Sequence, residues 1–157
     1  MSKQEFIGSN FPVTVLEPDA ARYNGNPSTD IVNMENWSRI TFIISEGAGG
    51  TGTATVTANA SDDASASSTT AIAFRYREIS THGTMVAGST ASTSGFTTTA
   101  GANKMVIVEI EDSELTAGKP FVYLTLTEVA NSAVDAGVTA ILSGPRYAQD
   151  IGIDPLS

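Results

Sequence analysis

The chain has 157 residues, no cysteine, and 17 acidic against 8 basic side chains, which give a net charge of −9. This length is typical of a single domain that buries its core without disulfide bonds or metal ions. The absence of cysteine excludes thiol catalysis and cysteine-based zinc sites. Because the basic residues are scattered, apart from Arg75 and Arg77, the sequence lacks the clustered positive charge that binds nucleic acid.

The apolar residues are arranged in short runs. None approaches the ~20 residues of a membrane span, and the first residues lead into no apolar segment of the kind found in secretory signals. We therefore expect no membrane partner, and we expect a protein whose apolar residues build an interior core.

The first third of the chain contains the clearest strand pattern. Residues 1–11 have no periodicity and are expected to form an arm. A short strand over 12–16 begins with a proline, which places it at a sheet edge. A weaker strand is expected over 29–32. In residues 36–47, apolar side chains alternate with polar ones, which predicts a half-buried strand near the middle of a sheet.

The same alternation returns after a glycine-rich turn. Residues 51–60 place small apolar side chains on one side and threonines on the other, and we predict a hairpin between residues 39–45 and 52–60. Residues 61–70 are a polar loop, and 72–78 form another strand. The remaining strands are expected at residues 85–87, 95–99, 104–110, 120–128 and 138–142, with one helical turn within 111–117.

These elements define the fold class. About eight or nine short strands, separated by turns rich in glycine and serine, are typical of a β-sandwich. We predict an all-β, single-domain antiparallel β-sandwich, jelly-roll-like, with extended N- and C-terminal arms. The arm covers residues 1–11, the domain 12–147 and the C-terminal tail 148–157.

Two motifs resemble functional sites but have simpler interpretations. Gly47, Gly49 and Gly52 match the spacing of the dinucleotide-binding fingerprint, which requires that the last glycine open a helix. Here it opens a β-forming run, so we expect only a turn. His82 is the single histidine, and no nucleophile motif accompanies it, so we expect a solvated loop residue.

The densest group of acids is Glu109, Glu111, Asp112 and Glu114. Oxygen ligands at this density can hold Ca²⁺, but the spacing matches no calcium-binding loop, and we expect a solvated acidic rim. Paired carboxylates also serve glycoside hydrolysis, yet Trp37 is the only tryptophan available for sugar stacking. We expect no catalytic residue, no cofactor and no metal.

The basic residues of the strands have a structural interpretation. Arg39, Arg75 and Arg77 alternate with Tyr76 and other strand residues, a pattern that also occurs in RNA-binding surfaces. The acidity of the chain argues against that function. We expect these arginines to form cross-strand ion pairs with Glu46 or Glu78.

A further observation concerns the order of six segments, which are residues 33–44, 50–57, 71–77, 96–101, 118–124 and 144–147. In the pattern and order of these segments, the chain resembles a group of small tailed-bacteriophage virion proteins. The resemblance implies a non-enzymatic structural component of the phage particle, best placed as a capsid decoration (cement) protein. It provides no catalytic residues to transfer.

This resemblance implies a set of partners and a location. The protein would bind the major capsid protein on the capsid exterior after synthesis in the host cytoplasm, and we expect a closed homotrimer. The residues expected at subunit or capsid contacts are Phe6, Ile7, Phe11, Trp37, Arg146, Tyr147, Ile151, Ile153 and Leu156. The simpler alternative is that they cover the domain's own edges.

Two other functions remain open at this point. Within the particle, the protein is alternatively a tail or neck component. From a different class, it is a carbohydrate- or receptor-binding β-sandwich, which would require exposed aromatic residues around a groove. An enzyme would require titratable groups that converge in a cleft, and the sequence shows no pattern of that kind.

Overall fold

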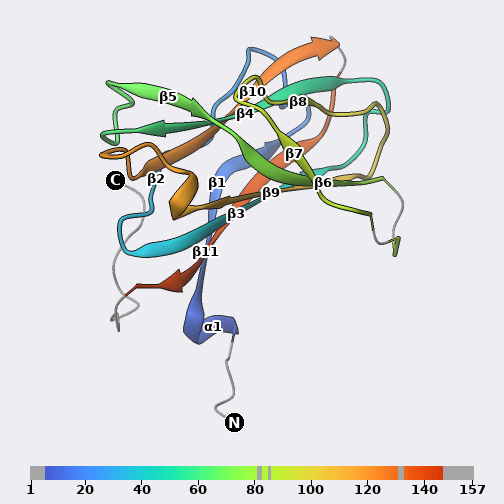
Figure 1. The fold of residues 1–157 in the computed structure, drawn as a ribbon. Helices are drawn as coiled ribbons and strands as arrows, with labels where there is room; N and C mark the ends of the chain where they lie inside the picture. The colour runs from blue at the N-terminus through green and yellow to red at the C-terminus, as the bar shows by residue number, and fades with distance from the viewer. Residues whose placement is uncertain (1–5, 81–82, 85, 131–132, 147–157) are drawn as a thin grey trace.

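A computed structural model describes residues 6–80, 83–84, 86–130 and 133–146. Its strands form two antiparallel sheets that pack face to face (Figure 1). The predicted all-β sandwich is therefore confirmed, whereas the narrower jelly-roll description stays a prediction. No helix in the described part of the chain is long and apolar enough to cross a membrane.

The larger sheet is built around β3 (Trp37–Glu46), the strand with the clearest alternation in the sequence. Its strand order is β1-β11-β3-β9-β6-β7, so β3 lies inside the sheet, as predicted. The other strands are β1 (Asn10–Asp19), β11 (Ala136–Pro145), β9 (Met105–Glu111), β6 (Phe74–Ile79) and β7 (Ser89–Ala91). Pro12 belongs to β1, which is an edge strand as its proline indicated.

The smaller sheet has the order β2-β10-β4-β5. Its strands are β2 (Val32–Asn33), β10 (Phe121–Ala130), β4 (Thr53–Ser61) and β5 (Thr69–Ile72), and β8 (Phe96–Thr97) pairs with β4. Two short helical segments complete the described chain. They are α1 (Phe6–Ser9) and the 3₁₀ helix η1 (Asp112–Glu114), and η1 lies within the range in which a helical turn was predicted.

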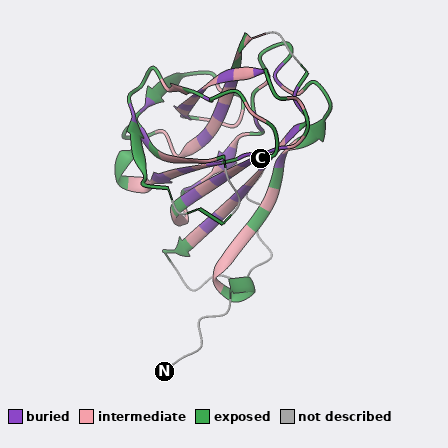
Figure 2. Cartoon of the chain, turned by 90° about the vertical axis from the view of Figure 1, so that its right-hand side faces the viewer, coloured by how far each residue is buried: buried purple, intermediate pink, exposed green. Residues whose placement is uncertain are grey.

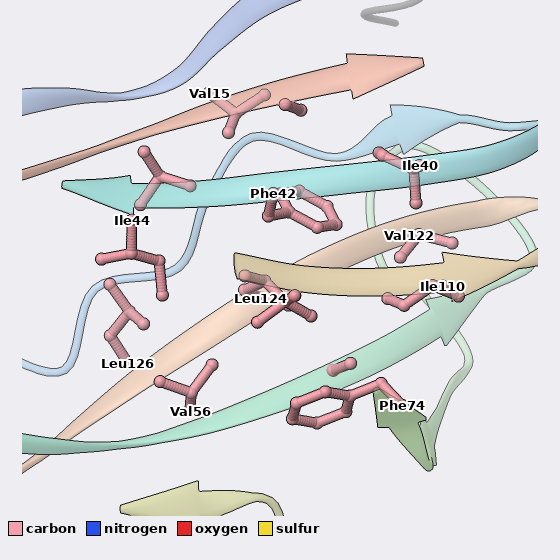
Figure 3. Close-up of a cluster of buried hydrophobic side chains, with 14 of the residues drawn as sticks. Val15, Ile40, Phe42, Ile44, Val56, Phe74, Ile110, Val122, Leu124 and Leu126 are labelled. Carbon is pink, nitrogen blue, oxygen red and sulfur yellow. The ribbon is translucent and has the colours of Figure 1, made fainter. Parts of the chain in front are cut away.

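The core lies between the inner faces of the two sheets. Ile40, Phe42 and Ile44 of β3 are fully buried, and side chains of the smaller sheet such as Leu124 and Leu126 lie opposite them (Figure 3). Complete burial of one such side chain contributes about 1.5–3 kcal/mol. Because these side chains recur at every second residue, the sequence pattern itself places one face of each strand in the core.

The predicted hairpin between residues 39–45 and 52–60 is wrong. β3 and β4 belong to different sheets, and β3 pairs instead with β11 and β9. The intervening segment crosses from one sheet to the other through Gly49, which has a φ of +105° and on which a Cβ would lie 2.1 Å from the carbonyl oxygen of Ala133. The alternation of apolar and polar residues cannot distinguish a hairpin within one sheet from two strands in facing sheets, since both arrangements bury the same side chains.

Two further strand predictions need correction. Residues 72–78 form parts of two strands, because the chain passes at Ala73 from β5 in the smaller sheet to β6 in the larger one. Ile72 and Phe74 are both buried on either side of this crossing, so the alternation continues through it. Of the strand expected at 85–87, the described residues Val86 and Ala87 lie outside any strand, and β7 begins two residues later.

The packing at β3 leads to a test of fold stability. Phe42→Ala removes a fully buried ring from the middle of the core, so the free energy of unfolding is expected to fall by about 3–5 kcal/mol. The control Thr41→Ala acts on the opposite face of the same strand and is expected to cost less than about 1 kcal/mol. Urea titrations followed by circular dichroism measure both changes. Equal losses would contradict the assignment of the inner face.

Candidate interaction surface

One end of the larger sheet brings the N-terminal helix beside the end of the last strand (Figure 1). A hollow of about 430 Å³ lies there. It is lined by Phe6, Ser9, Asn10, Ser38, Arg39, Ser143, Gly144 and Pro145. We refer to residues 6–11, 37–39 and 143–146 as the terminal surface. Five of the residues predicted at contacts belong to it, although they come from opposite ends of the sequence.

The exposed apolar part of the terminal surface is α1. Phe6 is 57% exposed and Ile7 is 82% exposed, and the helix carries no charged residue (Figure 2). In the described part of the chain, the other exposed large apolar residues are Val86, Met105 and Val129, each from a different segment. Single exposed apolar residues are ordinary on protein surfaces, whereas adjacent ones next to a hollow are typical of contact sites.

Phe11 and Trp37 differ from the helix residues in their surroundings. Both are only partly exposed, and both pack against the protein's own buried core. Trp37 is the first residue of β3 and lies opposite Pro145 in the β3–β11 register. These two side chains therefore cover an edge of the domain's own core.

Arg146 fixes the chain where it leaves β11. Its backbone N–H donates to the carbonyl of Asn36 at 2.9 Å, and its Nη2 lies 2.5 Å from Oδ2 of Asp112 in η1. Both contacts join the last described residue to segments far away in the sequence. These two contacts therefore hold the end of β11, which is part of the terminal surface, against the segment before β3 and against η1.

An ion-pair network adjoins the terminal surface on the outer face of the larger sheet. Arg75 Nη2 lies 2.9 Å from Glu109 and 2.8 Å from Glu111, and Arg39 Nη2 lies 2.9 Å from Glu111. The hydrogen bonds from Arg39 and then Arg75 lower the pKa of Glu111. Arg39 and Arg75 therefore form cross-strand ion pairs, but with Glu109 and Glu111, so the predicted partners Glu46 and Glu78 are wrong. Among the described residues, Arg77 forms no ion pair.

The four acidic side chains that were predicted to form a solvated rim each have a partner within the protein. Glu109 and Glu111 pair with arginines, Asp112 pairs with Arg146, and Glu114 accepts a hydrogen bond from the backbone N–H of Glu111. Among the described residues, no group of three or more potential ligands is placed to hold a metal ion.

Several predicted positions remain untested. Tyr147, Ile151, Ile153 and Leu156, which were expected at contacts, lie outside the described residues, as does His82. The glycine motif is described, and Gly52 leads directly into strand β4 with no helix after it. The interpretation of this motif as a turn is therefore confirmed, because the helix that a pyrophosphate site requires is replaced by a strand.

A larger hollow of about 650 Å³ lies at the other end of the larger sheet. It is lined by the last residues of β1 and β3 and the first residues of β11, including Leu16, Pro18 and Gly137. The acidic residues that line it are Asp19, Glu46 and Asp135.

One group of charged side chains was missed by the sequence reasoning. Lys104 is only 3% exposed and lies within 3.1 Å of Glu46 and 2.9 Å of Glu78. The only signal in the sequence is the position of Lys104 directly before a strongly apolar strand. Its partners come from β3 and β6, so no local spacing reveals them.

Comparison with known proteins identifies the fold. No protein-family model matches the chain, and no curated protein matches it significantly. The crystal structure of YomS, a protein derived from the SPBc2 prophage, has a similar fold, with a TM-score of 0.51. The match covers 86% of this chain and 93% of YomS at 15% sequence identity. At this identity the similarity establishes a shared fold.

The lowered pKa of Glu111 predicts how stability depends on pH. A carboxylate with a lowered folded pKa stabilises the fold above its unfolded pKa, which is near 4.5, and this contribution disappears as the pH falls through the folded value. Glu111→Gln should therefore unfold at lower urea than the wild type near pH 7, and the difference should vanish in strong acid.

The matched control is Glu17→Gln, at an exposed position of β1. It should shift the urea midpoint less than Glu111→Gln at neutral pH. A difference between Glu111→Gln and the wild type that stays constant from neutral to acid pH would contradict the stabilising role of the Arg39–Glu111–Arg75 network.

Proposed function

We propose that this protein is a non-enzymatic structural component of a bacteriophage particle and that it decorates the outer surface of the capsid. In this role it binds the major capsid protein on the capsid exterior after synthesis in the host cytoplasm. It requires no cofactor, nucleic acid or membrane. The observation that carries the proposal is the exposed apolar pair Phe6 and Ile7, which lies next to the hollow of the terminal surface.

The fold supports a phage origin. The similar structure is that of a prophage-derived protein, and it covers 86% of this chain. The sequence segments that resemble virion proteins lie between residues 33 and 147. The strand orders β1-β11-β3-β9 and β2-β10-β4-β5 also support the jelly-roll description, because strands β1 to β4 alternate between the two sheets. Jelly rolls recur in viral capsid proteins and in lectins.

The net charge and the symmetry of phage particles support a location on the capsid exterior. The net charge of −9 disfavours attraction to packaged DNA, so a location outside the capsid suits the chain. A decoration protein sits on a symmetric lattice, and closed symmetry is the usual solution for such assemblies. We propose a homotrimer in which α1 provides part of the contact with a neighbouring subunit or with the capsid.

A second candidate function follows from the outer face of the smaller sheet. The outward positions of β4 and β10 carry Thr55, Thr57, Asn59, Tyr123 and Thr125, with no charged side chain at positions 53, 55, 57, 59, 121, 123, 125 and 127. Asn59 Nδ2 donates to Thr125 Oγ1 at 3.3 Å, so the polar groups are held in fixed positions. A neutral face of hydroxyls with two aromatic rings, those of Phe121 and Tyr123, suits a carbohydrate.

Substitution of Ile7 tests the decoration role. Ile7→Asp places a charge at the most exposed apolar position of α1, so binding to purified phage particles should weaken about tenfold or more. Co-sedimentation of the purified protein with particles that lack it measures the affinity. The fold should be unaffected, because α1 contains no buried residue.

The control for this experiment is Val129→Asp, which changes another exposed apolar residue (59% exposed) in the smaller sheet. It should bind particles as the wild type does. Equal weakening in both variants would show that any surface charge disrupts binding and would remove the special role of α1. If both variants fail to bind particles but still bind a glycan array, the result would favour the carbohydrate-binding function.

The predicted C-terminal contacts give an independent test. Deletion of residues 148–157 removes Ile151, Ile153 and Leu156, so the occupancy of the capsid is expected to fall while the circular dichroism spectrum is retained. Gel densitometry of gradient-purified particles measures the occupancy. Unchanged occupancy would exclude the tail from the contact and would leave α1 as the segment to test.

A further inference from the structure

Lys104 is a buried amine that the proposed function does not use. It directly precedes β9 and lies opposite Glu46, the last residue of β3, whose backbone N–H donates to the carbonyl of Lys104 at 2.8 Å. The lysine side chain is 1% exposed and the glutamate side chain is fully buried. The two side chains therefore meet in the interior, on neighbouring strands whose backbones are already joined.

The surrounding groups place the lysine nitrogen between two carboxyl groups. Its Nζ lies 3.1 Å from Oε2 of Glu46 and 2.9 Å from Oε1 of Glu78. The hydroxyl of Tyr23 donates to Oε1 of Glu46. Thr99 donates to Oε1 of Glu78 twice, from its backbone N–H at 2.9 Å and from its hydroxyl at 3.0 Å. Nζ also donates to the carbonyl of Thr99.

One oxygen in this group lacks a hydrogen bond. Oε2 of Glu46 is buried and within ion-pair distance of Nζ, yet it accepts no hydrogen bond of acceptable geometry from the described residues. Buried carboxylate oxygens normally accept hydrogen bonds, and a buried charge without them is costly. Oε2 is therefore contacted only through the ion pair, which is a poor match for a buried carboxylate oxygen.

The balance of charges is also unfavourable when all three side chains are ionised. One amine faces two carboxyl groups, so the ionised set carries an excess negative charge in a nearly dry environment. Formation of an amide between Lys104 and Glu46 would remove one positive and one negative charge together. It would also remove the oxygen that lacks a hydrogen bond, and it would leave Glu78 with the two donors from Thr99.

We propose that Lys104 and Glu46 are joined by an isopeptide bond between Nζ and Cδ. The ammonium and the carboxylate condense to an amide and one molecule of water, so no oxidant or other reactant is required. Glu78 takes a proton from Nζ, and the nitrogen lone pair then attacks Cδ of Glu46. The Cδ–Oε2 bond breaks with its electron pair on Oε2, which leaves as water with two protons that originate from Nζ.

Tyr23 is placed to assist this step. Its hydroxyl donates to Oε1 of Glu46, the oxygen on which negative charge develops during the attack. Burial, and then the hydrogen bond to Glu46, raise the pKa of Tyr23, so it remains a donor at neutral pH. The fold holds the amine and the carboxyl group together, which replaces an encounter between separate molecules with a reaction inside one site.

The bond would cross-link β3 to β9 in a chain that has no cysteine. It would close a covalent loop between positions 46 and 104, and such a loop restricts the unfolded chain in the way that a disulfide does. This inference is independent of the virion role, because it concerns only residues in the interior of one subunit.

Mass spectrometry of the full chain tests the proposal. The denatured wild-type protein should be lighter than its sequence by one molecule of water, and proteolysis should release a branched peptide that contains both Glu46 and Lys104. Lys104→Met and Glu78→Gln should have the full sequence mass. The control Lys119→Met changes a half-buried lysine whose Nζ donates to Ser68 and which lies away from this group, and it should keep the deficit.

The wild-type protein alone decides the outcome, so the test stands even where a variant fails to fold. A wild-type mass equal to that of the sequence would overturn the proposal and leave a buried ion pair. A deficit that persists in Lys104→Met, or a branched peptide that lacks Glu46, would also overturn it by placing the lost water elsewhere. Circular dichroism of each variant shows whether the bond is lost with the fold retained.

Discussion

The structure depends on contact between the apolar inner faces of two sheets, with β3 in the middle of the larger one. Ile40, Phe42 and Ile44 are fully buried against the smaller sheet, and the strand also pairs with β11 and β9 on its two sides. Since the net stability of a domain is only about 5–15 kcal/mol, the loss of one such side chain removes a large share of it. The same strand positions both sites discussed above, because its first residues line the hollow beside α1 and its last residue contacts Lys104.

The sequence predicted the elements of the fold better than their partners. Alternation of buried and exposed side chains located β3, β4, β9, β10 and β11, because a strand with one face in a core must repeat every second residue. It did not predict that β3 and β4 belong to different sheets. Two strands bury the same residues whether they face each other across the core or pair side by side in one sheet. Only the path of residues 47–52, which cross from one sheet to the other, distinguishes the two arrangements.

The terminal surface and the charged groups near it were predictable only in part, because their partners also depend on strand order. Phe6 and Ile7 were predicted at contacts because they are apolar residues near one end of the chain, and the structure places both of them exposed on α1. The partners of charged residues were harder to predict. Arg39 and Arg75 pair with Glu109 and Glu111, whereas Glu46 and Glu78, the acids predicted for them, surround Lys104. Such pairings depend on strand order, which a single sequence does not contain.

The proposed role on the capsid requires a stable body and a separate contact surface, and we propose that the two ends of β3 serve these two needs. At one end, Glu46 is part of the buried polar group that includes Lys104, and at the other end the terminal surface presents α1. The most direct test of this account is the copy number of the protein on gradient-purified phage particles, counted against the major capsid protein by quantitative mass spectrometry. The account predicts a fixed stoichiometry to the capsid protein, on the order expected for a symmetric lattice of trimers. A few copies per particle, or a number that follows tail length, would contradict it.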